Sequence, residues 1–334
     1  MRFWAALVAA GVPAALLAAS VIAGPAAART LAVGEGKEFP LPSAAIDAAQ
    51  DGDTVLIEPG QYFDCAIVRH NGLTIAGNGG TVEITDKACE GKALLVIRAD
   101  HVTVRDLTLA RARVPDGNGA GIRLEGPNLL VQHVTFDNDQ VGILSGTEGG
   151  EVRIEACVFE NGGVGGDRPK YAVMAGRSAL LRIERSIFRD VKGGQIMTAA
   201  TRTEVVGNTI GDGTGDDPAE AVLATDGALL LEDNTIALGP NVPRREAAVA
   251  LWDDATGTIR RNKVVNQTGQ RITLLLDWSS GTPVLESNEI GKGDRLETSS
   301  GVWRHRASTQ FYARKAEARA LAGQLKRAVV GLWR

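Results

Sequence analysis

The feature that most constrains this chain is a short apolar phrase repeated along most of its length. The phrase reads VTVRDLTL from Val102, and its further copies begin at Leu129, Val152, Leu181, Thr203, Leu229, Gly257 and Pro283. When the copies are aligned on their third residue, successive copies lie 22 to 29 residues apart. A period of this length is typical of solenoids, in which each repeat buries its apolar face against its neighbours.

The pattern inside each copy indicates strands rather than helices. In the first copy the apolar positions are Val102, Val104, Leu107 and Leu109, so two pieces with a period of two residues are joined by a bend. Another Val-, Ile- and Leu-rich run precedes each copy, as in GIRLEG and EAVLATDG. Three short strands per coil predict an all-β solenoid, a parallel β-helix of about nine coils. Leucine-rich repeats and propellers have similar periods, but neither the LxxLxL signature nor four strands per unit is found.

The sixth position of the phrase predicts an internal row of amides. In the last four copies this position is asparagine: Asn208, Asn234, Asn262 and Asn288. Four asparagines at one register, one per coil, indicate a ladder in which each amide hydrogen-bonds to its equivalents about 4.8 Å above and below. Four unrelated turn asparagines would not also keep the flanking apolar register.

Residues 1–28 have the features of a Sec-type signal peptide. Arg2 precedes a long apolar stretch that ends in Ala26, Ala27 and Ala28, so cleavage is expected just before Arg29. A retained membrane anchor is disfavoured because two glycines and two prolines interrupt the stretch. The protein is therefore expected in the periplasm or outside the cell. Without Arg2, the formal charge falls by one from −4 to −5, and an acidic chain without a basic stripe is not expected to bind nucleic acid.

The chain has three cysteines, an odd number for an exported protein. Cys65 and Cys89 lie on either side of the first candidate coil, and we expect them to form a disulfide. Cys157 lies in the sixth position of its repeat and is interpreted as a buried free thiol.

Both ends of the solenoid, assigned to residues 29–305, are expected to carry helices. At the N-terminus, PLPSAAIDAAQ predicts a short capping helix whose N-cap is Ser43. At the C-terminus, residues 306–334 form an amphipathic pattern with Phe311, Leu321, Leu325 and Leu332 on one face and lysines and arginines on the other. That helix either packs on the last coil or a protein partner, or lies on an anionic membrane as a peripheral contact.

From Leu31 to Gly293 the chain resembles the exported bacterial right-handed parallel β-helix repeat proteins of the pectate-lyase-like superfamily. The resemblance rests on SAAIDAAQDGDTVLIEPGQY from Ser43, NGAGIRLEG from Asn118 and the repeated phrases. It implies a right-handed β-helix, and typical members act on polysaccharides as lyases, hydrolases or epimerases on the outer face of one sheet. At the positions that correspond to the relatives' titratable motifs, this chain has Tyr171, Met174, Gly194, Met197, Ala199, Glu220 and Leu223. The resemblance thus implies a degenerate catalytic groove.

The chain still holds residues suited to catalysis. A polysaccharide lyase needs a base and a cationic group, for which Arg123, His133, Lys170 and Tyr171 are the nearest candidates. Arg123 and His133 also fit as solvated solenoid residues. A glycoside hydrolase needs two carboxylates, and Asp253, Asp254 and Asp277 lie on consecutive coils. Aspartates also suit the corners of a β-helix.

Trp252 and Trp278 lie at the same repeat position and should stack in adjacent coils. If they face outward, they form a platform for a sugar ring; if inward, they fill the core. The acidic loop with Asp212, Asp216, Asp217 and Glu220 offers oxygen ligands for calcium but lacks the spacing of a standard calcium loop, so we expect no cofactor. The sequence predicts a polysaccharide-binding protein, with a carbohydrate-active enzyme and a structural envelope protein as alternatives.

Overall fold

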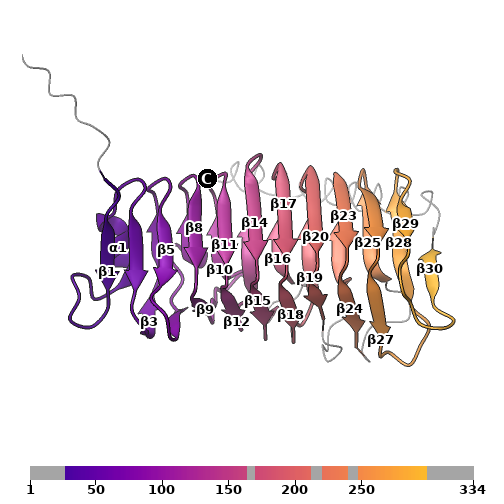
Figure 1. Ribbon diagram of the computed structural model, residues 1–334, viewed down its shortest axis with the longest axis horizontal. Helices are drawn as coiled ribbons and strands as arrows, with labels where there is room; N and C mark the ends of the chain where they lie inside the picture. Colours follow the sequence, from indigo (N-terminus) through magenta and orange to yellow (C-terminus); the bar gives the residue numbers. More distant parts are fainter. Residues whose placement is uncertain (1–26, 164–169, 212–219, 240–246, 299–334) are drawn as a thin grey trace, which may run out of the picture.

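A computed structural model describes residues 27–163, 170–211, 220–239 and 247–298. Over these ranges the chain winds into a solenoid with three parallel sheets, named here A, B and C, which run the length of the molecule (Figure 1). Every pairing between neighbouring strands of a sheet is parallel, as in β10 with β7 and β13. The prediction of an all-β parallel solenoid of about nine turns is confirmed.

From β2 to β28 each coil contributes one strand to each sheet, in the order A, B, C, whereas β1 and β29 lie in sheet A and β30 in sheet C of the incomplete end coils. Sheet A contains β1 (Thr30–Val33), β2 (Thr54–Ile57), β5 (Thr74–Gly77), β8 (Val102–Arg105), β11 (Leu129–Gln132), β14 (Glu151–Glu155), β17 (Leu180–Glu184), β20 (Arg202–Val206), β23 (Ala228–Glu232), β26 (Thr256–Arg260) and β29 (Val284–Glu286). Sheet B contains β3 (Gly60–Asp64), β6 (Val82–Asp86), β9 (Thr108–Ala110), β12 (Thr135–Asp137), β15 (Val158–Glu160), β18 (Ile187–Arg189), β21 (Thr209–Ile210), β24 (Thr235–Leu238) and β27 (Lys263–Asn266). Sheet C contains β4 (Ala66–Val68), β7 (Ala93–Ile97), β10 (Ala120–Leu124), β13 (Val141–Ser145), β16 (Tyr171–Ala175), β19 (Gly194–Thr198), β22 (Val222–Ala224), β25 (Ala247–Asp253), β28 (Thr273–Ser279) and β30 (Arg295–Thr298).

The repeated phrase forms sheets A and B, and its register is the one that the sequence predicts. The third residues of the copies pair directly from coil to coil, as Val104 does with Val131 and Val131 with Ile154. These side chains are fully buried in the core. The bend between the two strand pieces is a single residue in the left-handed conformation, with φ between 50° and 66°: Asp106, His133, Ala156, Arg185, Gly207, Asp233, Arg261 and Ser287. One left-handed residue reverses the alternation, so the side chains on both sides of the bend point inward.

The residue after this bend is the one at the sixth position of the phrase. The Nδ2 group of Asn208 donates to Oδ1 of Asn234, Asn234 donates to Asn262, and Asn262 donates to Asn288, at 2.9 to 3.0 Å. Each Oδ1 atom also accepts the backbone N–H of the preceding coil, as Asn234 does from Asn208 at 2.9 Å. The amides therefore satisfy buried backbone donors at a corner where the strands do not pair.

Aromatic packing fills the middle coils. Phe136, Phe159 and Phe188 stack in adjacent coils, with ring centroids 4.7 Å apart and nearly parallel planes. The second residue of the facing sheet C strand is small in the same coils. A Cβ atom on Gly121 would meet the ring of Phe136 at 2.7 Å, and one on Gly142 would meet Phe159 at the same distance. The small residues thus provide the volume that the rings occupy.

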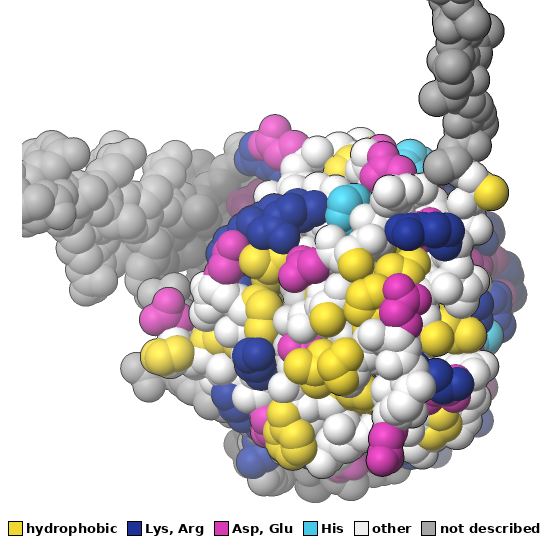
Figure 2. Space-filling view, turned by 90° about the vertical axis from the view of Figure 1, so that its left-hand side faces the viewer, with side chains coloured by type: hydrophobic (Ala, Val, Ile, Leu, Met, Phe, Trp, Pro, Cys, Tyr) yellow, Lys and Arg dark blue, Asp and Glu magenta, His cyan; other side chains and the backbone are white. Residues whose placement is uncertain are grey.

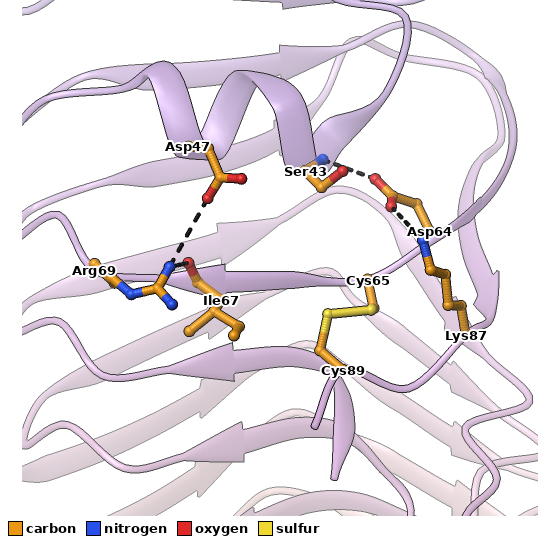
Figure 3. Close-up of a disulfide and its surroundings, with 8 residues drawn as sticks. All are labelled: Ser43, Asp47, Asp64, Cys65, Ile67, Arg69, Lys87 and Cys89. Atoms are coloured by element: carbon orange, nitrogen blue, oxygen red, sulfur yellow. Dashed lines mark hydrogen bonds and ion pairs between the residues drawn. A yellow bond between two sulfur atoms is a disulfide. The ribbon is translucent and has the colours of Figure 1, made fainter. Parts of the chain in front are cut away.

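At the N-terminal end, helix α1 (Pro42–Ala48) packs Ala45 and Ile46 into the core. The expected capping by Ser43 is wrong, because Leu41 is the N-cap residue and makes no side-chain capping bond. The carboxylate of Asp64 at the end of β3 instead accepts the Ser43 N–H at 2.7 Å, and Lys87 lies 3.7 Å from its other oxygen (Figure 3). A side chain distant in sequence therefore satisfies the helix terminus.

The disulfide between Cys65 and Cys89 joins the start of β4 to the segment before β7, beside α1 (Figure 3). Cys157 is a buried free thiol, and burial raises its pKa to about 12. Among the described residues no helix is both long and apolar enough to cross a membrane. The predicted signal peptide, apart from its last two residues, and the predicted C-terminal helix lie outside the described residues.

Candidate functional site

The outer face of sheet C is the best candidate for a binding surface. In several of its strands two successive residues both point into the core, as Leu94 and Leu95 do in β7 and Ala248 and Val249 do in β25. In β16, Ala172, Val173 and Ala175 belong to the main core, whereas Tyr171 and Met174 belong to a separate apolar cluster on the outside. Met174 and the residues that pair with it from coil to coil consequently form a row that runs along the outer face.

This row is apolar over the second half of the solenoid. We call it the outer apolar row, and its members are paired from coil to coil: Leu144, Met174, Met197, Leu223, Ala250 and Leu276. Leu223 and Leu276 are only 6% and 8% exposed although their strands direct them away from the core. The row includes Met174, Met197 and Leu223, three of the positions at which the sequence resemblance implied a degenerate groove. The outer face therefore carries no acid or base along this row.

The two tryptophans lie at the edge of the outer apolar row. The register pairs Trp252 with Trp278, and their ring centroids are 5.3 Å apart with planes inclined by 42°. Both indoles are half-buried and pack with Leu223, Ala250 and Leu276 rather than with the main core. They thus face outward, but they form a tilted pair rather than a flat platform.

Tyr171 and Lys170 lie at the start of β16. The Tyr171 ring lies across Gly194 in the next coil, where a Cβ atom would overlap it. The Tyr171 hydroxyl donates to Oε2 of Glu220 at 3.4 Å. Glu220 belongs to the predicted calcium loop, whose three aspartates lie outside the described residues. In the described part of the chain, no cluster of three or more His, Cys, Asp or Glu side chains has the proximity to hold a metal ion.

In the first half, charged side chains at the ends of β7 and β10 are paired with one another, while Ile67, Val96 and Ala120 on the outer face belong to an apolar cluster. Lys92 Nζ lies 2.6 Å from Glu125 Oε1, and Arg98 Nε lies 2.8 Å from Glu125 Oε2. Glu90 contacts both cations. These hydrogen bonds, first from Lys92 and then from Arg98, lower the pKa of Glu125. The cations are neutralised by their neighbours, so they are poor candidates for an attacking or enolate-stabilising group.

Arg123 is the fourth residue of β10 and lies between these two regions. It pairs in register with Val96 and Leu144. Its Nε atom is buried and has no hydrogen-bond partner among the described residues. The register places Arg123 two coils before β16, so the strands do not place it beside Lys170 or Tyr171.

The aspartates do not converge as a hydrolase pair. Asp277 is 8% exposed, pairs in register with the core residue Leu251, and accepts hydrogen bonds from the Ser279 backbone and hydroxyl at 2.9 and 2.7 Å. Asp253 is exposed and left-handed at the end of β25. Asp254 accepts a hydrogen bond from the hydroxyl of Ser280 at 3.2 Å. Asp253 pairs in register with Ser279, two residues beyond Asp277, so the two carboxylates do not stack on each other in adjacent coils.

A buried carboxyl group that sequence reasoning missed is Asp139, at the corner between β12 and β13. Its Oδ1 atom accepts the Ala112 N–H at 2.7 Å, and its Oδ2 atom has no partner among the described residues. Burial raises the pKa of this carboxyl well above its usual range. The neighbouring Gln140 amide binds Val114 and Gly119, so the pair anchors the loop before β10.

The N-terminal end of the solenoid presents a different surface. A shallow groove of about 600 Å³ is lined by residues of the loop before α1 and by β3, including the exposed side chains of Leu41 and Phe63. Figure 2 shows this end, where hydrophobic side chains lie in patches between lysines, arginines, aspartates and glutamates. The groove is open and mixed in character, and it contains none of the predicted site residues.

No protein-family model matches the chain, and no curated protein matches its sequence. The solved structures similar to it include a pectin methylesterase from carrot, with 12% identity and a TM-score of 0.47 over 75% of this chain and 85% of that one. Pectin methylesterase PemA from Erwinia chrysanthemi has 12% identity and a TM-score of 0.46, over 82% and 93%. A PL6 family alginate lyase, AlyGC, has 14% identity and a TM-score of 0.39, over 82% of this chain and 39% of that one. The β-helix assignment rests on the sheet topology, and no reaction is transferred from these proteins.

Proposed function

We propose that this is an exported β-helix protein that binds an extracellular or envelope polysaccharide along the outer face of sheet C without turning it over. The observation that carries the proposal is the outward-facing pair of Trp252 and Trp278 beside the outer apolar row. Sugar rings present apolar C–H faces that pack on indoles, and a row of adjacent coils offers repeated contacts at the 4.8 Å coil spacing.

Binding without catalysis is supported by the chemistry of the same face. Along the outer apolar row, leucine, methionine and alanine occupy the positions where an acid or base would have to stand. The candidate carboxylates Asp253 and Asp277 are two residues out of register, Asp277 is buried, and the cations near Glu125 are paired. A degenerate groove that retains carbohydrate affinity fits these features better than a lyase, epimerase or hydrolase.

The test is a glycan screen with the purified mature protein. We expect measurable affinity for at least one uronate-containing or neutral polysaccharide, and no release of unsaturated products or reducing ends. Trp252→Ala and Trp278→Ala should each weaken binding roughly tenfold, since an aromatic contact contributes about 0.5–1.5 kcal/mol beyond its area.

Phe63→Ala is the matched control, because Phe63 is an aromatic side chain that is 62% exposed on sheet B. It should leave glycan affinity unchanged. Turnover of any glycan would establish the enzyme alternative. Binding to none of the glycans would leave a structural role in the envelope.

The C-terminal segment, residues 306–334, extends this proposal. We expect it to form a helix that packs its apolar stripe on the solenoid or on a protein partner. The last described strand, β30, belongs to sheet C, the sheet that carries the outer apolar row. Deleting Thr309–Arg334 should lower solubility or the melting temperature. Unchanged stability with loss of salt-sensitive binding to anionic vesicles would instead establish a membrane contact.

A further inference from the structure

Asp53 is a buried carboxylate in the first coil, and its hydrogen-bond donors belong to Arg29 and Gln50 in the N-terminal part of the chain. Its side chain is 2% exposed and lies just before β2. Oδ1 accepts the backbone N–H of Arg29 at 2.8 Å, and Oδ2 accepts from the guanidinium Nη2 of the same residue at 2.7 Å. The backbone N–H of Gln50, just after α1, also donates to Oδ2 at 2.9 Å. Asp53 thus fastens the residue before β1 to the end of α1.

The carboxylate is held in its ionised form. The side-chain hydrogen bonds from Arg29 come first among the causes that lower the pKa of Asp53 to about 2, and the Arg29 and Gln50 backbone groups add to them. The guanidinium that balances this charge is half in solvent, with a side chain 52% exposed. A second positive charge beside Oδ1 would therefore be well placed, and the group that donates to Oδ1 is the Arg29 backbone N–H.

The same nitrogen is the one that the predicted signal-peptide cleavage would release. The sequence Ala26-Ala27-Ala28 places the cut between Ala28 and Arg29. Ala27 and Ala28 are exposed and have no regular secondary structure, whereas the chain enters sheet A at Thr30. The cleavage site thus lies at the boundary between exposed chain and the first contact with the solenoid.

We propose that Asp53 is the binding site for the mature N-terminus, which a signal peptidase creates by hydrolysing the Ala28–Arg29 bond. Water supplies the hydroxyl that completes the carboxylate of Ala28, and the Arg29 nitrogen leaves as an amine that takes up protons to become an ammonium group. That ammonium group replaces the neutral N–H at Oδ1. The proposal rests on the export part of the proposed function and is independent of glycan binding.

Processing would then strengthen the first coil. The Arg29 carbonyl accepts the Thr54 N–H at 2.8 Å, so holding Arg29 also holds the start of the pairing between β1 and β2. Sheet edges at solenoid ends are the places where fraying begins. An ion pair between a terminal ammonium and a buried carboxylate fixes that edge without an added domain.

The test compares two chains that differ only in their start: one beginning with a free amine at Arg29, and one beginning at Ala27. We expect the shorter chain to melt about 2 °C or more higher at pH 6. In the Asp53→Asn background the difference should vanish, because an amide accepts a hydrogen bond but does not pair with a charge. Asp51→Asn is the matched control, since this neighbouring carboxylate accepts the Asn71 N–H at 2.8 Å, and it should preserve the difference.

The pH dependence tests the proposal even if Asp53→Asn does not fold. A carboxylate raises the pKa of an ammonium group above its ordinary value of about 7.7–8.0, so the gain is present below that pH and is lost as pH rises through the raised pKa. Besides Asp53 and the Arg29 guanidinium, Glu38 is the charged group that acts on this residue. Equal melting temperatures at pH 6, a gain that persists at pH 11, or a mature N-terminus found elsewhere by mass spectrometry of the exported protein would each overturn the proposal.

Discussion

The first and second halves of the solenoid keep the same strand register but fill the position after the bend with different chemistry. In the first half the position holds Leu107 and Val134, which are buried apolar side chains. From Ser186 onward its oxygen or amide groups bind the neighbouring coils, and Ser186 accepts the Cys157 N–H at 3.1 Å as the ladder's first member. A β-helix corner can therefore be closed by packing or by hydrogen bonding within one fold.

The side chains on and beside the outer face of sheet C also differ between the two halves. Both halves carry apolar side chains on this face, but the first half adds the Lys92, Arg98 and Glu125 network at its strand ends, and the second half adds the tryptophan pair. The two halves share one strand register, so the difference lies in the identity of side chains that the register does not determine. In a solenoid, architecture and surface chemistry are separable because each row of side chains changes independently.

The largest expected effect on stability comes from replacing an asparagine of the second half by the kind of apolar side chain that the first half has at the same position. Asn234→Leu should destabilise the protein by roughly 4 kcal/mol, because the Asn208 backbone N–H and Nδ2 group both lose their acceptor in a buried site. Leucine itself fits this position, as Leu107 shows in an earlier coil. Guanidinium unfolding measures the change.

The control for this substitution is Asn78→Ala, which removes an exposed amide that contacts Glu58 at 3.2 Å and should cost less than about 0.5 kcal/mol. If Asn234→Leu costs no more than the control, the ladder does not distinguish the two halves energetically.

Removing the disulfide should weaken the first half specifically. Replacing Cys65 and Cys89 together by serine should cost about 3 kcal/mol, since the bond closes a sequence separation of 24 residues. Cys157→Ser is the control: the next coil already holds Ser186 at this position, and the cost should stay below about 1 kcal/mol. Unfolding with and without reductant checks both values. Equal losses in the two variants would contradict the assignment.

The boundary between the halves is filled by the phenylalanine stack, which a single methyl group should disturb. Gly142→Ala should cost roughly 2 kcal/mol, because its Cβ would lie 2.7 Å from the Phe159 ring and 2.9 Å from the Ala172 carbonyl. Gly146→Ala is the control. Gly146 directly follows the same strand, and a Cβ atom there would lie 3.8 Å from the flexible end of the Arg123 side chain. A melting-temperature shift of equal size in both variants would show that the stack is loosely packed.

The smallest effect concerns two buried aspartates with opposite pKa shifts. Burial raises the pKa of Asp139, so its folded-state pKa exceeds the unfolded value, and wild-type stability should fall as pH rises from the unfolded pKa toward the folded one. Asp139→Asn keeps an acceptor for the Ala112 N–H and should remove this decline. Asp53, with a pKa lowered to about 2, should lose stability only as pH falls from about 3.8 to 2. Unfolding curves at several pH values test both, and parallel curves for Asp139→Asn and wild type would contradict the first.

Much of the fold was predictable from the repeat. The alternation of apolar residues determines which side of each strand faces the core, so the pairing of Val104 with Val131 and of Trp252 with Trp278 follows from counting residues. The same counting places the asparagines at one corner. Exposure at the corners is harder to predict: Asp253 and Asp277 have the same parity in the register, but Asp277 is buried whereas Asp253 is exposed and left-handed at the end of β25.

The sequence alone determined the period, the register and the chemistry of each row, because these depend on residues a fixed distance apart along a regular backbone. Only the tertiary structure decided which rows meet across the coil. The fit of Gly121 and Gly142 against the phenylalanine rings, the capping of α1 by Asp64 in place of Ser43, and the contact of Arg29 with Asp53 all depend on the cross-section of the solenoid. That cross-section is set by corner geometry, and side chains that meet there are 15 to 24 residues apart with no periodic relation that would reveal them.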